Sequence, residues 1–96
     1  MDEFEVRELL KKSSYPFLAA YSNEWIDSDG RKLSFDDMAR KHLENCYNML
    51  QEQKYGIERG FFLGGVKYDE SKYEEIVEIT KRLYYAKMEE LMNYLN

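Results

Sequence analysis

The sequence predicts a mainly α-helical fold that contains one small β-hairpin. Three observations predict it: a long apolar stripe at helical spacing near the C-terminus, a shorter one in the middle of the chain, and an Asp-Gly turn signal between two short apolar segments. The 96 residues leave room for a single domain, residues 1–96. We therefore expect a short N-terminal helix, the hairpin, and then two longer helices packed as an antiparallel pair.

The N-terminal segment from Asp2 to Lys12 is expected to form the first helix. Acidic residues stand at its start and lysines at its end, which complements the helix dipole. Its apolar residues are Phe4, Val6, Leu9 and Leu10. Pro16 either ends this region or lies in the first turn of a second short helix through Tyr21, since proline suits a first helical turn.

The segment from Trp25 to Phe35 is predicted to be a hairpin. Asp29-Gly30 is a strong signal for a two-residue turn, because glycine tolerates a positive φ. That turn would place Ile26 opposite Leu33 and Trp25 opposite Ser34. An isolated two-stranded ribbon is only marginally stable, so we expect it to lie against the helices.

A middle helix is predicted to begin at Ser34, where Ser34 and Asp37 have the spacing of a capping box. Apolar residues recur along one face at Ala39, Leu43, Cys46, Tyr47 and Leu50, with Met38 beside them. Gly56 is expected to end this helix. The stretch from Gly56 to Gly65 is then expected to form a loop with a short extended piece. It either lines a ligand or partner surface, or connects the helices with Phe61 and Phe62 folded inward.

The longest predicted helix runs from Ser71 to Tyr94, with a capping box formed by Ser71 and Glu74. About 24 residues would span about 36 Å, so the helix should cross the domain or overhang it. Its stripe contains Tyr73, Ile76, Val77, Thr80, Leu83, Tyr84, Met88, Leu91 and Leu95, widened by Ile79, Tyr85 and Met92. Because this stripe is wider than one neighbouring helix would cover, we expect a homo-oligomer, with a dimer favoured, or a protein partner.

Composition narrows the class of protein. A net charge of −5 argues against non-specific binding to nucleic acid, and we expect no direct nucleic-acid contact. No uncharged stretch is long enough to span a membrane. The single cysteine, Cys46, cannot form an internal disulfide, and the acidic start lacks the basic residues of an export signal. We therefore expect the protein in the cytoplasm.

Candidate chemical sites are few. His42 and Cys46 stand four residues apart, a metal-ligand spacing, but no other His or Cys could complete the site. We expect instead that Cys46 packs in the core and that His42 forms a hydrogen bond at the helix edge. No serine has a plausible base, because the chain has a single histidine. We therefore predict no catalytic residues, no metal, no cofactor and no enzymatic activity.

Two charged groups are candidate binding residues. The acidic row Glu70, Glu74 and Glu78, together with Tyr85, Met88 and Met92 further along the same helix, is the predicted partner-binding surface. The alternative is a basic corner that would hold an anionic ligand. Its residues are Arg31, Lys32, Arg40 and Lys41. Like charges at i, i+4 repel one another and destabilise a helix slightly, which makes a use for the acidic row conceivable.

The spacing of several residues resembles a pattern in small, uncharacterised proteins of tailed phages and prophages. The residues that carry it are Trp25, Asp29, Gly30, Met38, His42, Leu43 and Asn45, followed more loosely by Tyr84, Tyr85, Glu89 and Glu90. The resemblance implies an origin more than an activity, and it carries no residue role across. Small acidic phage proteins include inhibitors of host defence, such as anti-CRISPR proteins, and sponges for nucleotide signals.

Three function hypotheses follow. The leading one is a non-enzymatic, phage- or prophage-derived binding protein that inhibits a host defence factor by protein contact in the host cytoplasm. The second is an oligomeric sponge that captures a nucleotide signal near the basic corner and the glycine-rich loop. The third is a structural or assembly accessory protein whose long helix serves only to oligomerise.

Overall fold

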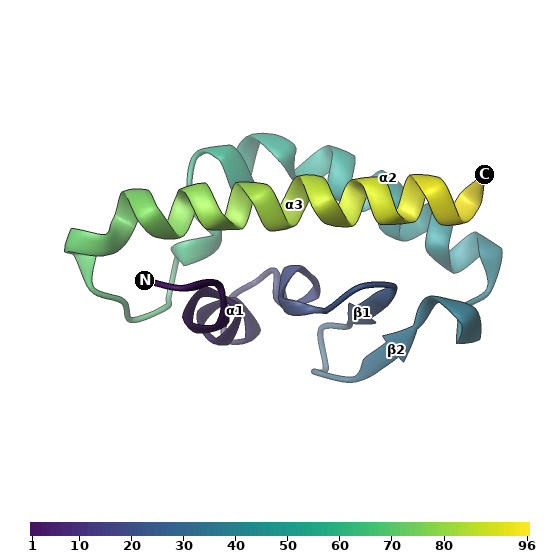
Figure 1. Cartoon of the computed structure of the whole chain (residues 1–96), viewed down its shortest axis with the longest axis horizontal. Helices are drawn as coiled ribbons and strands as arrows, with labels where there is room; N and C mark the ends of the chain where they lie inside the picture. The colour runs from purple at the N-terminus through teal and green to yellow at the C-terminus, as the bar shows by residue number, and fades with distance from the viewer.

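Two long helices form one layer of the molecule, and the N-terminal third of the chain covers one side of that layer (Figure 1). The computed structural model describes all 96 residues. In chain order the elements are α1 (Glu3–Lys11), the 3₁₀ turn η1 (Pro16–Ala19), β1 (Glu24–Ile26), β2 (Lys32–Ser34), η2 (Phe35–Asp37), α2 (Arg40–Glu58), η3 (Phe61–Leu63), η4 (Glu70–Lys72) and α3 (Tyr73–Leu95). Figure 1 shows α2 and α3 running in opposite directions, which confirms the predicted fold class.

Helix α1 begins as its acidic start predicts. The Asp2 carboxylate accepts a hydrogen bond from the Glu5 amide at 2.9 Å, and the Glu5 side chain accepts one in return from the Asp2 amide, so the two form a capping box. Val6 and Leu10, four residues apart, are buried on one face. The prediction that Phe4 belongs to the apolar side is wrong, because Phe4 lies two residues from Val6 and its side chain is exposed.

Pro16 starts a short helical turn, as one of the two alternatives predicted. All four residues of η1 are buried. The guanidinium of Arg7 donates hydrogen bonds to the carbonyl oxygens of Ala19 at 2.9 Å and Ala20 at 2.7 Å. Those carbonyls lie at the end of the turn, where no further helical amide reaches them.

The hairpin forms, but its predicted register is wrong by one residue. Trp25 lies opposite Leu33, and Ile26 lies opposite Lys32. The reason is a three-residue loop in place of a two-residue turn. The Asp27 carboxylate accepts hydrogen bonds from the amides of Asp29 at 3.0 Å and Arg31 at 2.9 Å, and Gly30 takes a left-handed φ of +83°.

Both predicted ends of the middle helix are corrected. Ser34 caps only η2, where its hydroxyl accepts the Asp36 amide at 3.3 Å. The extended backbone of Met38 and Ala39 then separates η2 from α2. At the other end α2 continues through Gly56 and stops at Glu58.

Helix α2 buries most of the face that was predicted for it. Leu43, Cys46 and Leu50 are buried, Tyr47 is half-buried and Ala39 is exposed. The following segment contains no extended piece but the turn η3. Within that turn Phe62 is buried, whereas Phe61 faces solvent.

Helix α3 begins two residues after the predicted start. The predicted capping box at Ser71 is wrong, because Ser71 is itself capped: its amide and its hydroxyl donate to the Asp69 carboxylate at 3.0 and 2.7 Å. The 23 residues of α3 span about 35 Å. The longest dimension of the molecule, α3 included, is 40 Å, so the helix runs along almost its whole length.

The width of the α3 stripe is accounted for within the chain. Helix α2 packs against α3 on one side, and α1 and η1 pack against it on another. As a result Ile76, Val77, Ile79, Leu83 and Leu91 are all buried in the same core as Leu10, Trp25 and Phe35. None of the helices combines the length and the apolar character that a membrane-spanning segment requires.

Candidate functional site

A pocket of about 350 Å³ lies between η1, the hairpin and α2, and we call it the Trp25 pocket. Its lining residues are Ser14, Pro16, Phe17, Trp25, Asp27, Ser28, His42, Asn45, Cys46 and Met49. They come from three separate segments of the sequence. The pocket brings together the only tryptophan, the only histidine and the only cysteine of the chain.

Two stacked aromatic rings form part of the pocket wall. The rings of Phe17 and Trp25 lie 4.8 Å apart between centroids and are inclined by only 5°. Trp25 is 4% exposed, because β1 presses it against η1. The indole N–H makes no hydrogen bond to the protein and is not completely enclosed, so it retains a free donor.

The polar side chains of the pocket are also free of internal partners. His42 and Asn45 project from successive turns of α2 and are exposed, and neither forms a hydrogen bond within the protein. The hydrogen bond predicted for His42 at the helix edge is therefore absent. Ser14 and Ser28 likewise carry free hydroxyls. Donors and acceptors thus surround an apolar wall.

Cys46 is buried, as predicted, and its thiol is unreactive. Burial raises the pKa of its thiol to about 11, so the thiol stays protonated at neutral pH. His42 lines the same pocket, but no cluster of three or more His, Cys, Asp or Glu side chains arranged to hold a metal ion is found in the structure. The pair therefore offers neither a thiolate nucleophile nor a complete ligand set.

Asp27 is the only charged side chain that lines the pocket. Its carboxylate is occupied by the hairpin loop: beyond the two amides, the Nε of Arg31 binds it at 2.9 Å. Hydrogen bonds from the Arg31 amide and guanidinium hold the pKa of this carboxyl below its usual value, so it is ionised at neutral pH. No lysine or arginine lines the pocket.

The predicted partner-binding residues lie along α3 and the turn before it. Glu74, Glu78, Tyr85 and Met92 are exposed, with 49% of Tyr85 and 45% of Met92 accessible. At 100° per residue these four lie within about 40° of one another around the helix, opposite the buried side. We call them, with Glu70 and Met88, the outer α3 surface. Glu70 is exposed in η4, and Met88 is half-buried.

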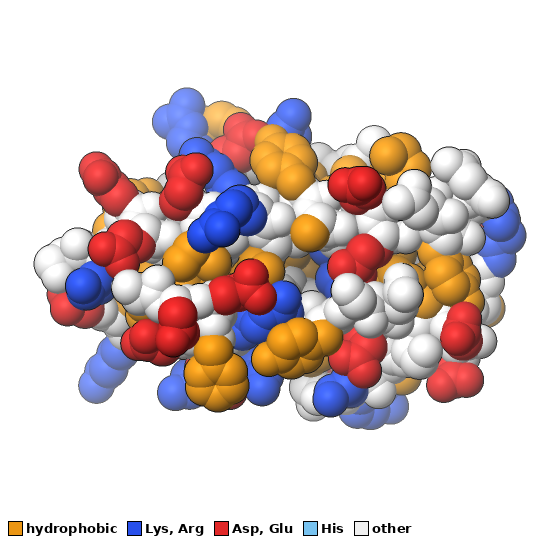
Figure 2. All heavy atoms as spheres, in the orientation of Figure 1, with side chains coloured by type: hydrophobic (Ala, Val, Ile, Leu, Met, Phe, Trp, Pro, Cys, Tyr) orange, Lys and Arg blue, Asp and Glu red, His pale blue; other side chains and the backbone are white.

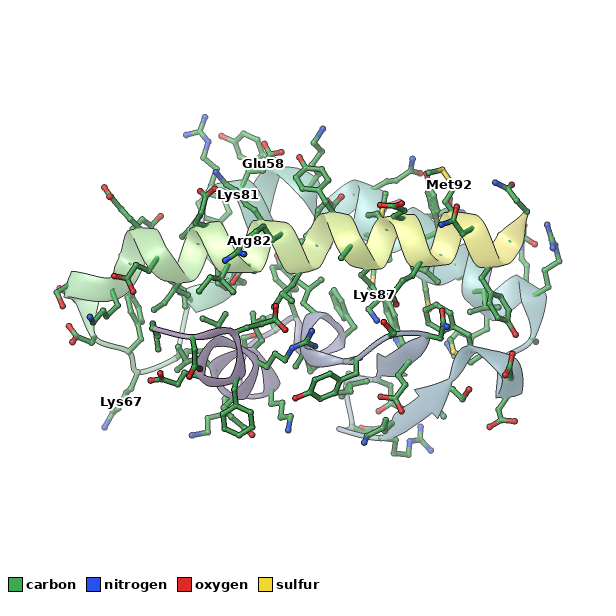
Figure 3. The ribbon with its side chains drawn as sticks, in the orientation of Figure 1. Glu58, Lys67, Lys81, Arg82, Lys87 and Met92 are labelled. Atoms are coloured by element: carbon green, nitrogen blue, oxygen red, sulfur yellow. The ribbon has the colours of Figure 1, made fainter.

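Neighbouring residues hold the apolar members of this surface in place. The Tyr85 hydroxyl donates to the Glu58 carboxylate at 2.7 Å, which raises the pKa of Tyr85. Met92 accepts a weak hydrogen bond from Tyr47 at 3.9 Å. Figure 3 shows Met92 and Lys87 on opposite sides of α3, with Lys87 directed toward the N-terminal layer.

Folding gathers two acidic segments at one end of the molecule. Helix α1 contacts α3, so the acids at the start of α1 join those at the start of α3. Figure 2 shows several acidic side chains at the end where α3 begins, on the left of the view, with basic side chains among them and further acidic side chains toward the other end. We call the end where α3 begins the acidic end; its members are Asp2, Glu3, Glu5, Glu70, Glu74, Glu75 and Glu78. Along α3 the acidic end stops at Lys81 and Arg82, which are labelled in Figure 3.

The four predicted ligand-binding cations are not assembled into one corner. Arg31 lies in the hairpin loop and binds Asp27 and Asp29, at 2.9 and 3.5 Å. Arg40 starts α2 and donates to the last carbonyl of α3, that of Leu95, at 2.8 Å. Figure 1 shows the hairpin loop and the start of α2 at opposite ends of β2. Lys32 and Lys41 are exposed, and neither lines a pocket.

Two features of the structure were not predicted from the sequence. The first is the Trp25 pocket, for which no local pattern exists, because its residues come from three separate segments. The second is Lys87, which is 2% exposed although lysine is rarely buried. A signal did exist, since Lys87 interrupts the apolar stripe of α3 between Leu83, Tyr84 and Leu91.

Comparison with protein-family models, with curated proteins and with solved structures found no match to this chain.

Proposed function

We propose that this chain is a non-enzymatic binding protein that acts by contact with another protein, as a phage- or prophage-derived inhibitor of a host defence factor. The contact surface is the outer α3 surface together with the acidic end. The observation that carries the proposal is that exposed tyrosine and methionine side chains continue along α3 from carboxylates that two segments of the chain contribute.

Charge determines the kind of partner. At the acidic end the Met1 ammonium binds Glu75 at 2.8 Å and Arg7 binds Glu3 at 3.1 Å, whereas Asp2, Glu5, Glu74 and Glu78 form no ion pair. Because α1 contacts α3, these unpaired carboxylates from two segments add to one field. A surface of this sign attracts a basic surface, such as the nucleic-acid channel of a defence nuclease. Complementary charge of this kind raises the association rate and disfavours wrong partners.

The apolar part supplies the contact area. Tyrosine and methionine are enriched at protein interfaces, and Tyr85 and Met92 remain about half exposed after the core side of α3 is fully covered. Both side chains contact neighbouring residues, Glu58 and Tyr47, yet about half of each remains available to a partner. An acidic region beside an apolar one matches a partner whose basic channel is bordered by an apolar patch.

Affinity capture from the natural host tests the proposal. The double variant Glu74→Lys and Glu78→Lys should lose a specifically captured host protein by at least about tenfold, because it reverses the charge that steers the encounter. Asp37→Lys with Glu52→Lys is the control: it makes the same charge change at exposed positions away from the acidic end. Equal capture by both double variants, or the absence of any captured partner, would contradict the proposal.

The same surface is the place where a second copy of the chain would bind. Met88→Glu with Met92→Glu places two charges there. Met92 is exposed, but Met88 is half-buried and packs against the core, so circular dichroism must first show that the variant is folded. If the surface is used, light scattering should show a smaller particle, or the captured host protein should be lost. A folded variant with unchanged size and unchanged binding would remove the apolar part of the surface from the proposal.

A further inference from the structure

We propose that the Trp25 pocket binds a small, uncharged heteroaromatic molecule of the nucleobase or nucleoside class. This site is independent of the proposed protein contact, since no residue of α3 lines the pocket. It also differs from the predicted nucleotide site, because none of the four predicted cations lines it.

The size of the pocket limits its ligand. About 350 Å³ is near the lower end of the range for small-molecule sites, about 300–1,000 Å³. A single planar ring system with one sugar-sized substituent fits such a volume, whereas a dinucleotide or a large cofactor does not. Ser28 of the hairpin loop and His42 and Asn45 of α2 line the pocket and are exposed, so a ligand can enter without unfolding of the layer.

The apolar wall favours a flat, aromatic ligand. Phe17 and Trp25 are 7% and 4% exposed and stack on each other, so each presents only a small part of its ring to the pocket. Pro16 and Met49 complete the apolar lining. Rings gain from stacked or edge-to-face contact, and the thioether of methionine also contacts aromatic rings favourably. The stacked pair is held rigidly between η1 and β1, so little ordering is required when a ligand binds.

The free polar groups favour a ligand with both donors and acceptors on its edge. The carboxamide of Asn45 offers both, the imidazole of His42 offers one of each when neutral, and the Trp25 indole offers a donor. None of them has a partner within the protein, so each is available to a ligand. A nucleobase edge presents adjacent donors and acceptors, which a carboxamide can pair in a bidentate manner.

The charge of the pocket excludes a phosphate from the favoured ligand. The only charged lining group is the Asp27 carboxylate, whose guanidinium partner Arg31 belongs to the hairpin loop and does not line the pocket. A phosphate placed there would meet the Asp27 carboxylate, and the nearest cation, the Arg31 guanidinium, is already bound to that carboxylate. The ligand is therefore a base or a nucleoside in preference to a nucleotide.

Fluorescence offers a direct measurement, because Trp25 is the only tryptophan of the chain. Adenosine, guanosine, cytidine and uridine are each titrated into the full chain, and isothermal calorimetry repeats any titration that saturates. We expect at least one nucleoside to change the Trp25 emission saturably below about 1 mM. Its 5′-monophosphate should bind at least about tenfold more weakly, because of the repulsion by Asp27.

Two variants of α2 form a matched pair. Asn45→Ala removes a pocket side chain, and Asn48→Ala removes the same side chain three residues on, outside the pocket; both positions are exposed, so both variants should fold. We expect Asn45→Ala to weaken binding about three- to tenfold, as for one lost hydrogen bond, and Asn48→Ala to leave it unchanged. Saturation by none of the nucleosides, equal or tighter binding of the monophosphate, or unchanged binding by Asn45→Ala would each overturn the proposal.

Discussion

At the scale of single residues, Lys87 is the strongest polar anchor of the fold. Its ammonium group donates three hydrogen bonds: to the carbonyls of Tyr21 at 2.8 Å and Glu24 at 2.9 Å, and to the Glu90 carboxylate at 2.9 Å. The same Glu90 oxygen accepts the amide of Asn23, whose φ is +59°. Burial lowers the pKa of Lys87, and Glu90 acts in the opposite direction. One side chain of α3 thereby fixes the path of the chain between η1 and β1.

Lys87→Met should destabilise the fold by about 3 kcal/mol, since it leaves two carbonyls and a carboxylate without their buried partner. Because the pKa of Lys87 is lower in the folded state than its usual 10.5, raising the pH toward 10.5 relieves the cost of burying the charge. The stability difference between wild type and variant should therefore grow over that range. Denaturant unfolding measures both effects. Lys81→Met is the control, because Lys81 is half-buried and forms no ion pair. If Lys81→Met lowered the free energy of unfolding as much as Lys87→Met does, the hydrogen bonds of Lys87 would not be what stabilises the fold.

At the scale of elements, the turn after α2 determines how α2 and α3 meet. Gly60 follows the helix in a left-handed conformation, φ +76°, and its amide donates to the Ile57 carbonyl at 3.2 Å. The Tyr73 hydroxyl, from the first residue of α3, donates to the Arg59 carbonyl at 3.1 Å. A β-carbon at Gly60 would lie 2.6 Å from that hydroxyl. The end of α2 and the start of α3 are thus joined at a position where only glycine fits.

Gly60→Ala should cost about 2–3 kcal/mol, as backbone strain and the displacement of Tyr73 add together. Gly65→Ala isolates the strain alone, because Gly65 has a similar φ of +80° with no atom within 4 Å of an added β-carbon. It should cost about 1–2 kcal/mol. Thermal or denaturant unfolding of both variants measures the difference. Equal losses would mean that Tyr73 moves aside freely.

At the scale of the whole molecule, one core connects every layer. Val6 and Leu10 from α1, Trp25 from β1, and Leu50 and Leu91 from the long helices belong to the same buried cluster of 22 residues. The same packing that buries them brings the acids of α1 beside those of α3 and closes the Trp25 pocket. Stability, the acidic end and the pocket therefore depend on a single arrangement of the layers.

Leu10→Ala should lower the stability of the entire fold by about 2–5 kcal/mol, as for a large-to-small change at a fully buried position. Trp25 emission reports the hairpin, and far-ultraviolet circular dichroism reports mainly α2 and α3. If the fold is one cooperative unit, both transitions shift together along the denaturant axis. Transitions that separate, with the helices unaffected, would show that the N-terminal layer folds independently.

Local features of the fold could be predicted from the sequence, and those that depend on long-range contact could not. The apolar stripe of α3 and the existence of the hairpin follow from periodicity and turn chemistry. The register was missed because the Asp27 side chain converts a two-residue turn into a three-residue loop. The helix starts were misplaced at Ser34 and Ser71 because 3₁₀ turns precede both helices, and their short runs lack a pattern of their own.

The candidate sites also contain features that local spacing predicts and features that depend on long-range packing. That Glu74 and Glu78 share a face of α3 could be predicted, because residues four apart on a helix do so whatever surrounds it. That this face binds a partner stays a prediction. The exposure of Tyr85 and the burial of Ile79 could not be predicted, since both depend on where α2, α1 and η1 pack. The Trp25 pocket could not be predicted from the sequence, because Phe17, Trp25 and Asn45 meet only after three segments fold together.

The sequence by itself determined a long amphipathic helix, a second helix antiparallel to it and a small hairpin, because spacing and turn residues act over a few positions. The tertiary structure alone decided that the wide stripe of α3 is covered from two sides, that Lys87 lies in the core and that the two acidic segments meet. The physical reason is that burial and charge proximity belong to pairs of segments distant in the chain. No local pattern specifies which segments those are.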